Sequence, residues 1–388
     1  MKKYFFFAAA ALLALAACSK VTPVETPDQE IGFSVVSHLN ATKADNDTNE
    51  GDAVEHMAFY DGKTFSVFAF SNADTWDKTT ATVDAKYMND VAISKQGDVW
   101  KAASGTYYWP KKAYLSFAAY SPSSAAAPTI TKVTNTTAAN NTINYAWDSY
   151  TVAASNKAEY ADDLMVSDFQ KDLTANPTTA THFVPGVPIL FHHLLSKLTF
   201  KFNRALYDNN NVDEDNSYIT LTKVEIVNHY NEGEYSKTVA NSWVLSADKK
   251  VTSEVQGTST SLQLDKPATT PTFADWGNSI IVIPQVLGST SGTGENAVIT
   301  YGPQTLRLTY TITTKYTTAA GGATVTEGTA DDPIVSEVPL YLSTLESWDI
   351  NKSIVYNVTI YPYAKDEIKF DPAVVNWSDG GIGTIEVK

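Results

Sequence analysis

The stretch Glu30–Ala44 reads EIGFSVVSHLNATKA and alternates as a half-buried β-strand does. Apolar side chains fall on one side of an extended chain and small or polar ones on the other: Ile31, Phe33, Val35 and Leu39 against Gly32, Ser34 and His38. The polar run DNDTNEGD (Asp45–Asp52) follows. The bond between Lys43 and Ala44 lies directly before this run, and an exposed peptide bond that follows a basic residue is a site where a trypsin-like protease cuts. The stretch is therefore either a first strand released by cleavage between Lys43 and Ala44, or an ordinary strand before an ordinary loop.

Composition limits the class of protein. The chain has 388 residues, enough for two domains of about 150 residues each. It carries 28 Lys and Arg against 43 Asp and Glu, a net charge of −15, which argues against nucleic acid as a partner and against charge-driven binding to an anionic membrane. An aromatic content of 12%, together with abundant Thr, Val and Tyr, favours strands.

The first 17 residues have the pattern of an export signal. Two lysines precede the apolar run Tyr4–Leu15, which is too short to span a bilayer. The sequence LAAC ending at Cys18 resembles the lipobox of bacterial lipoproteins, in which the cysteine becomes the first mature residue and carries acyl chains. We therefore expect lipidation at Cys18 and anchoring to the outer membrane, with residues 18–29 as a tether. The alternative is a plain signal peptide with an incidental cysteine.

Short strand patterns recur along the rest of the chain, and no segment has a convincing helical period. Between two blocks of strands, residues 176–188 contain three prolines and a glycine and are typical of a linker. This pattern predicts an all-β protein with two antiparallel β-sandwiches, residues 30–186 and 187–388. The predicted strands are Lys63–Phe70, two around Pro110 within Thr106–Tyr120, Ile189–Phe202, Ile219–Val227, Ser279–Pro284, Leu306–Tyr316 and Ile354–Tyr361, with a hairpin turn at Gly321-Gly322. The stretch Asp162–Phe169 is apolar at its centre and flanked by carboxylates.

No catalytic or metal-binding pattern is found. His192 and His193 adjoin in a predicted strand, so their side chains face opposite ways and share no metal. The run Asp45–Gly51 resembles the start of a calcium loop, but its glycine falls at the seventh position and His56 stands where the bidentate glutamate belongs. We predict no enzymatic activity, no cofactor and no metal site.

Aromatic residues gather in one part of the predicted first domain. They could form a platform on which a sugar stacks, or they could pack in the core and on sheet faces, as aromatic residues in strands generally do. The pattern favours packing. The residues are Trp100, Tyr107, Tyr108, Trp109 and Tyr120.

Several motifs in a fixed order resemble the fimbrillins, subunits of the type V pili of Gram-negative anaerobes. Each motif alone is weak, but together they run from Cys18 to Trp377. They are CSK after the lipobox, IGFSV…ATKA, YYWP with YLSFAAYSP, ADDLMVS, VPILFHHLLSKLTF, IIVIPQ, and the ending WDINKSIVYNVTIYP…IKFDPAVVNW.

The resemblance implies two transthyretin-like antiparallel Greek-key β-sandwiches in tandem and a place at the cell surface, in the outer membrane and fimbrium. It also implies that a trypsin-like protease cuts between Lys43 and Ala44 and removes the lipidated first strand. Removal of this strand would open an apolar groove, which a strand from another subunit would fill. The sequence departs from the family at this bond, since Lys43 stands where fimbrillins usually carry Arg.

The strand donor could be the C-terminal tail, through Ile382, Ile385 and Val387 after Gly380-Gly381, or this tail could be the last strand of its own domain. The sequence thus predicts a structural or adhesive pilus subunit, with other subunits, the protease and a possible host-surface ligand as partners. The alternative is a monomeric surface lipoprotein that binds glycans through exposed aromatics.

Overall fold

The computed structural model describes residues 29–36, 64–97, 99–153, 163–174, 186–205, 217–237, 242–266, 272–292, 297–316, 323–329, 331–362 and 368–376. The described chain is all-β, as predicted, and its helical content is the 3-10 turn η1 (Ala138–Asn140). No helix of the described residues is long and apolar enough to cross a membrane.

Strands from the first half of the chain form an eight-stranded sheet. They are β1 (Phe33–Val36), β2 (Thr64–Asn72), β3 (Lys86–Gln96), β4 (Val99–Ala102), β5 (Tyr114–Ser121), β8 (Met165–Ser167), β9 (Gln170–Leu173) and β10 (Val187–His193). Their order is β2-β3-β4-β1-β10-β8-β5-β9, and β5 also pairs with β2. Seven of these strands, all but β9, therefore close into a ring.

The ring buries apolar side chains on both of its surfaces. Along β2, Phe65 and Val67 belong to one apolar cluster and Phe68 and Phe70 to another. The first cluster draws residues from all seven strands, so it fills the ring. Because β2 and β5 are covered on both faces, their sequences are nearly continuous apolar runs instead of alternating ones.

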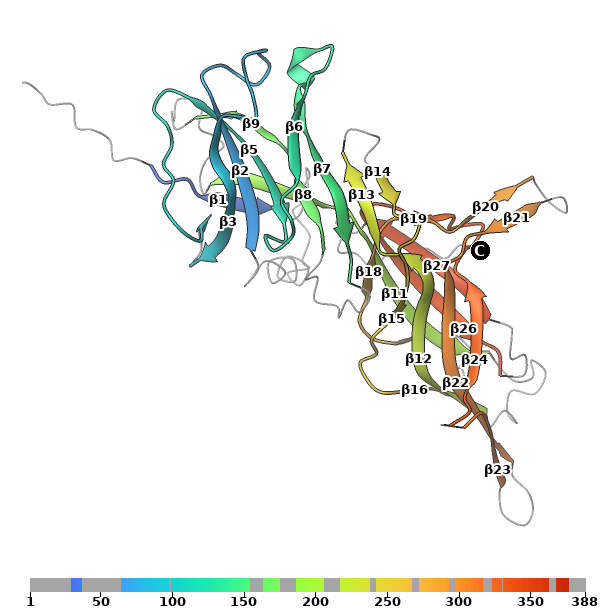
Figure 1. Cartoon of the computed structure of the whole chain (residues 1–388). Coiled ribbons are helices and arrows are strands. Elements are labelled where there is room, and N and C mark those ends of the chain that lie inside the picture. Colours follow the sequence, from blue (N-terminus) through green and yellow to red (C-terminus); the bar gives the residue numbers. More distant parts are fainter. Residues whose placement is uncertain are drawn as a thin grey trace, which may run out of the picture.

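A four-stranded sheet combines strands from both halves of the chain. Its strands are β6 (Thr129–Val133), β7 (Thr142–Thr151), β13 (Glu232–Ser236) and β14 (Ser242–Leu245), in the order β14-β13-β7-β6. The central pairing of β7 with β13 places Tyr235 opposite Trp147. The second apolar cluster joins this sheet to the outside of the ring and includes Leu195 and Ile281 from the second half. Figure 1 shows these strands between the ring and the sandwich at the other end.

Two sheets from the second half of the chain pack face to face around the third cluster. One has the order β17-β11-β26-β27 with β18 on β11, and the other has the order β15-β12-β22-β23 with β16 on β12 and β24 on β22. The bounds are β11 (Ser196–Arg204), β12 (Ser217–Tyr230), β15 (Lys250–Glu254), β16 (Leu262–Leu264), β17 (Ala274–Asp275), β18 (Ile280–Val282), β22 (Thr305–Tyr316), β23 (Ala323–Glu327), β24 (Ile334–Pro339), β26 (Lys352–Ile360) and β27 (Ile368–Asn376).

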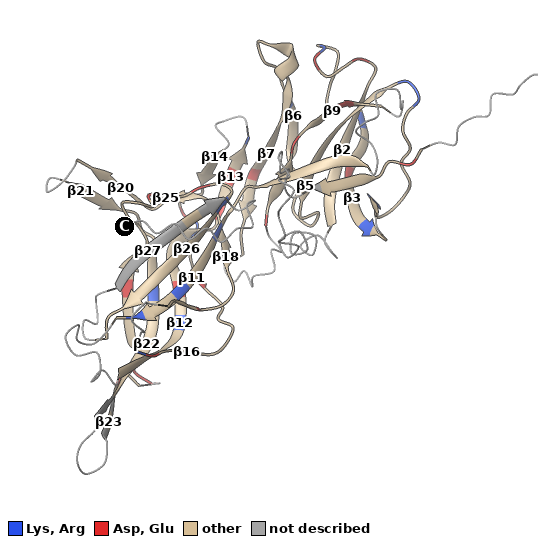
Figure 2. Cartoon of the chain, turned by 180° about the vertical axis from the view of Figure 1, so that it is seen from behind, with Lys and Arg blue, Asp and Glu red and all other residues tan. Residues whose placement is uncertain are grey.

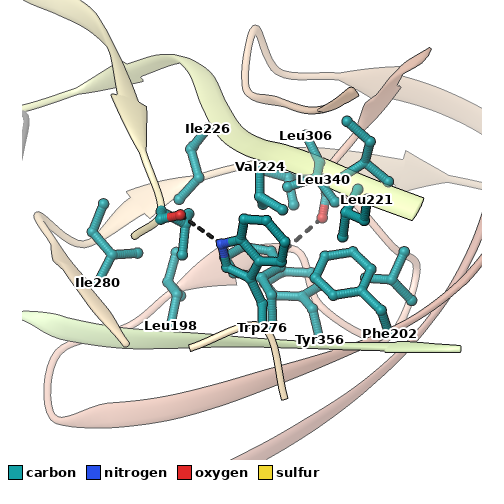
Figure 3. Close-up of a cluster of buried hydrophobic side chains, with 14 of the residues drawn as sticks. Leu198, Phe202, Leu221, Val224, Ile226, Trp276, Ile280, Leu306, Leu340 and Tyr356 are labelled. Atoms are coloured by element: carbon teal, nitrogen blue, oxygen red, sulfur yellow. Dashed lines mark hydrogen bonds between the residues drawn. The ribbon is translucent and has the colours of Figure 1, made fainter. Parts of the chain in front are cut away.

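The core of this sandwich is apolar, and the polar groups of Trp276, Trp348, Tyr310 and Tyr356 within it are hydrogen-bonded. Trp276 is buried, and its indole N–H donates to the Val255 carbonyl oxygen at 2.6 Å (Figure 3). Phe200 stacks on Tyr356 with ring centroids 5.2 Å apart. Two small sheets complete the described fold: β19 (Gln285–Val286) with β25 (Ser347–Trp348), and β20 (Gly288–Ser291) with β21 (Val298–Tyr301).

Most pairs are antiparallel as expected, but β1–β10 and β11–β26 run parallel. In both cases the partners are far apart in sequence, so no hairpin dictates their direction. The strand β10 is part of the ring, and the chain passes from it to the sandwich through Leu194 and Leu195.

Most predicted strands are found, as β2, β5, β10 with β11, β12, β18, β22 and β26. The hairpin strands β22 and β23 pair from Tyr316 opposite Ala323, while Gly321 and Gly322 lie outside the described residues. The prediction of two strands around Pro110 is wrong on its first half, because Tyr108 makes an isolated bridge to Glu30 instead of a strand.

His229 on β12 allows a test of burial in the sandwich. It is buried, its Nε2 lies 2.7 Å from Ser253 Oγ, and burial lowers its pKa to about 4. In the unfolded chain the His229 imidazole takes up a proton near pH 6.5, whereas in the folded chain it stays neutral until a lower pH. The free energy of unfolding should therefore fall by about 3 kcal/mol as the pH drops from about 6.5 to about 4. Urea unfolding at several pH values measures this.

The control is His229→Gln, which leaves a polar partner for Ser253 and does not titrate. Its free energy of unfolding should depend less on pH across this interval. An unchanged pH dependence would show that His229 is not the group responsible.

Candidate functional site

The first described segment, Gln29–Val36, is called the N-terminal ribbon here. Its strand β1 is one of the seven strands that form the ring, and it lies between β4 and β10. Phe33 pairs with Trp100 of β4, and the four residues of β1 pair in parallel register with 187–190 of β10. The described residues of β4 and β10 have no pairing with each other in the strand order, so β1 is what joins these two strands.

Backbone hydrogen bonds hold the ribbon on both sides. Ile31 N–H donates to the Tyr107 carbonyl oxygen at 2.8 Å, and Trp109 N–H donates to the Gln29 carbonyl oxygen at 3.0 Å. On the other side, Val187 N–H donates to the Gly32 carbonyl oxygen at 2.9 Å. Each such bond contributes about 0.5–1.5 kcal/mol net, and a buried group left without its partner costs about 1–3 kcal/mol.

Two side chains of the ribbon enter the cluster inside the ring. Ile31 and Phe33 are each 2% exposed. The Phe33 ring meets Phe65 and Phe117 edge to face, with centroids 6.2 Å and 5.9 Å away. Burying two such side chains stabilises the fold by about 1.5–3 kcal/mol each. The alternation expected from the sequence is confirmed at Ile31 and Phe33, while Leu39 and His38 lie outside the described residues.

Gly186 lets the ribbon approach the start of β10. A Cβ at this position would lie 2.8 Å from the backbone carbon and oxygen of Gly32 and from the Phe33 carbonyl carbon. These are backbone atoms, which move less readily than the end of a side chain. A glycine is therefore required here by close packing of two backbones.

The strands β4 and β10, which flank β1, are called the walls of the site, and each pairs with a second strand besides β1. On one side, β4 pairs with β3 over four registered residues. On the other, β10 pairs with β8, and Leu194 N–H donates to the Leu164 carbonyl oxygen at 2.8 Å. Both walls therefore keep strand pairings that do not depend on the ribbon.

Two histidines strengthen the β10 wall through separate carboxylates. His193 Nδ1 lies 2.8 Å from Asp163 Oδ2, and His192 Nε2 lies 3.0 Å from Asp168 Oδ1. Burial raises the pKa of the Asp163 carboxyl, whereas the hydrogen bond from His192 lowers the pKa of Asp168. Their different partners confirm that the adjacent histidines do not converge on one site.

The site residues predicted from the sequence lie outside the described residues: Cys18, Lys43, Ala44, Ile382, Ile385 and Val387. The run Asp45–Gly51 lies outside them too. Within the described ranges, no group of three or more His, Cys, Asp or Glu side chains is arranged to hold a metal ion. The structure instead adds residues that the sequence did not single out, namely Gly186 and the walls β4 and β10.

The aromatic residues singled out in the sequence are mainly packing residues. Trp100, Trp109 and Tyr120 are buried, so the prediction of packing is confirmed for them. Tyr108 is 43% exposed, and its carbonyl oxygen accepts a hydrogen bond from the Tyr87 hydroxyl at 2.5 Å. Three of the five rings are therefore not available as a flat sugar-binding platform.

Comparisons with known proteins agree with this architecture. A model of a family described as fimbrillin-like matches residues 42–377. The structure resembles that of a fimbrial protein from Bacteroides vulgatus, with a TM-score of 0.52 and 16% identity over 90% of this chain and 100% of that one. At this identity the likeness shows the fold alone.

Two solved fimbrial proteins of Porphyromonas gingivalis are similar to the chain at lower TM-scores. The fimbrilin FimA of Porphyromonas gingivalis gives a TM-score of 0.40 and 8% identity over 90% of this chain and 98% of that one. The tip fimbrial protein Mfa3 of the same species gives a TM-score of 0.31 and 12% identity over 81% of this chain and 94% of that one. None of the curated proteins compared matches the chain.

The family match covers most of the sequence, so the chain belongs to the fimbrillin-like family. This confirms the resemblance inferred from the motifs.

Substituting Gly186 tests the close approach of the two backbones. In Gly186→Ala the added methyl group meets Gly32, so the ribbon and β10 have to move apart. We expect the free energy of unfolding to fall by about 1–3 kcal/mol in urea titrations. Ser34→Ala, a change on the ribbon itself, should cost less than half as much. Equal stability of Gly186→Ala and the unsubstituted protein would contradict the packing described here.

Proposed function

We propose that this protein is a structural or adhesive subunit of a type V cell-surface pilus, exported as a lipoprotein and assembled by protease-triggered strand exchange. The observation that carries the proposal is the position of β1 inside the ring, between two walls that have other partners. Family membership supports a place in fimbriae at the cell surface, and LAAC at Cys18 supports a lipid anchor in the outer membrane.

The physical argument concerns what release of the ribbon would leave behind. Loss of Ile31 and Phe33 would open apolar space inside the ring, and loss of the backbone bonds would leave unpaired groups at β10 and at Tyr107–Trp109. Unpaired strand edges and apolar slots are templates for another strand. A strand supplied by a second subunit would restore both kinds of contact. Such head-to-tail contacts do not close on themselves and so build a filament.

The donor in this proposal is the C-terminal tail with Ile382, Ile385 and Val387. The described strand β27 ends at Asn376, paired opposite Lys352, and 12 residues of sequence follow. At about 3.3 Å per residue, an extended tail of that length would reach about 40 Å, enough to span a ring strand in a neighbouring subunit.

The same proposal includes two transthyretin-like Greek-key domains. The expected division lies between residues 186 and 187. The pairing of β10 inside the ring favours a joint at Leu194-Leu195, and the sheet shared by β7 and β13 ties the two parts together.

Limited trypsin digestion of residues 19–388 tests the proposal. The described fold begins at Gln29, so removing the leader and Cys18 takes away none of the described contacts. We expect cleavage between Lys43 and Ala44, loss of the segment that contains the ribbon, and then growth of multimers. Mass spectrometry and size-exclusion chromatography follow the two steps.

Two variants separate the steps. Lys43→Gln should stay uncut at this bond and form no multimers larger than a dimer, whereas a tail variant with Ile382→Asp and Ile385→Asp should be cut but should not grow into larger multimers. A chain that loses the ribbon and remains monomeric at all concentrations would contradict strand exchange. An intact monomer that binds oligosaccharides would support the alternative of a glycan-binding lipoprotein.

A further inference from the structure

The strands β20 and β21 form a two-stranded sheet, called the projecting hairpin here. Gly288 pairs with Tyr301 at its base and Ser291 with Val298 toward its tip. Among the described strands it is hydrogen-bonded to no other sheet. Figure 1 shows it standing out from the sandwich beside β19. A two-stranded hairpin alone in water is marginally stable, so its persistence requires an explanation.

Side chains at the base fix the direction of the hairpin. The Tyr301 ring meets Tyr341 edge to face at 5.7 Å, and the Thr290 and Tyr341 hydroxyls are hydrogen-bonded. Thr290 N–H also donates to Glu346 Oε1 at 3.3 Å. The hairpin is therefore held outward by specific contacts although its strands contribute nothing to the apolar core.

The hairpin carries apolar side chains that face water. Val298, Ile299 and Tyr301 are 60%, 44% and 55% exposed, and Val286 of neighbouring β19 is 66% exposed. All four residues of β21 are exposed. Exposed apolar residues that gather on one element indicate an interaction site more strongly than scattered ones do.

The hairpin also lacks the usual protection of free strand edges. Natural edge strands are guarded by charged side chains, prolines or bulges. Neither β20 nor β21 contains Lys, Arg, Asp, Glu or Pro, and their pairing is regular. The edge strands β9 and β15, by contrast, carry charges, such as Lys171 and Lys250.

Charge restricts contact with a second copy of this chain to parts of the surface that carry few charges. Two copies, each with a net charge of −15, repel one another over most of their surfaces. The strands β20 and β21 carry no charged side chain, as the absence of blue and red on them in Figure 2 shows, although Glu295 stands in the sequence between them, so these strands are a part of the surface where this repulsion is weak. Because the hairpin projects, contact through it keeps the acidic bodies apart, and charges separated by more than about 8 Å are largely screened at physiological salt.

We propose that two copies associate edge to edge through β21, in antiparallel pairing about a two-fold axis, to form a four-stranded sheet. Such an isologous contact matches Val298 and Ile299 of one copy with the same uncharged strand of the other. The contact is small compared with the roughly 1,200 Å² of standard interfaces, so a dimer held by it alone is weak. It does not depend on strand exchange, because it uses the intact chain with its ribbon in place.

Sedimentation equilibrium of residues 19–388 with Lys43→Gln tests the proposal, since this variant keeps its N-terminal ribbon. We expect a concentration-dependent dimer. Ile299→Lys places like charges across the two-fold axis and should weaken dimerisation about tenfold or more. Val335→Lys is the matched control: Val335 is 56% exposed on β24, and its substitution should leave dimerisation unchanged.

Cross-linking gives a second readout that does not depend on affinity. Residues 19–388 contain no cysteine, so a single Thr300→Cys in the middle of β21 reports on pairing directly. Under mild oxidation it should form a disulfide-linked dimer much faster than Val335→Cys. A monomer at all concentrations, equal cross-linking of the two variants, or equal weakening by Ile299→Lys and Val335→Lys would overturn the proposal.

Discussion

Closure of the ring between β4 and β10 is the constraint on which the first half of this protein depends. The other ring strands follow one another through pairings that do not involve β1, but these two walls meet only across it in the described strands. A four-residue strand with Phe33 at its start therefore completes a core to which seven strands contribute. The position of β1 in the chain matters as well, because β1 precedes all other described strands and its release by a cut after it breaks none of them.

The energetic scale of this contact suits a replaceable strand. A few backbone bonds at about 0.5–1.5 kcal/mol each and two buried side chains at about 1.5–3 kcal/mol each add up to several kcal/mol. Whole domains are stable by about 5–15 kcal/mol, so the ribbon is significant for stability but not all of it. The shared sheet has a complementary role, since β7 and β13 tie the ring to the sandwich through pairing unrelated to β1.

The sequence predicted strands in which apolar and polar residues alternate locally. Ile31 and Phe33 were expected to be buried together, and the regular alternation in β22 and β26 matches their burial. The sequence missed β3, in which Asn89 and Asp90 interrupt the alternation where the register shifts. It also missed β7, although Ile143, Tyr145 and Trp147 alternate there with polar or small residues. It also missed the parallel direction of β1 and the sheet shared by β7 and β13. Such pairings join residues that are far apart in sequence, so no local signal specifies them. Gly186 was read as part of a linker because its role depends on Gly32, more than 150 residues away.

The most direct test of the ribbon's role is hydrogen exchange of the cleaved chain, compared residue by residue with the intact one. Once the ribbon has been released, the amides of Trp109 and Val187, which donate to Gln29 and Gly32, should lose protection. The amides of β11 and β26, which pair with each other in the sandwich, should keep their protection. Unchanged protection at Trp109 and Val187 after loss of the ribbon would contradict the account, because the ring would then close without β1.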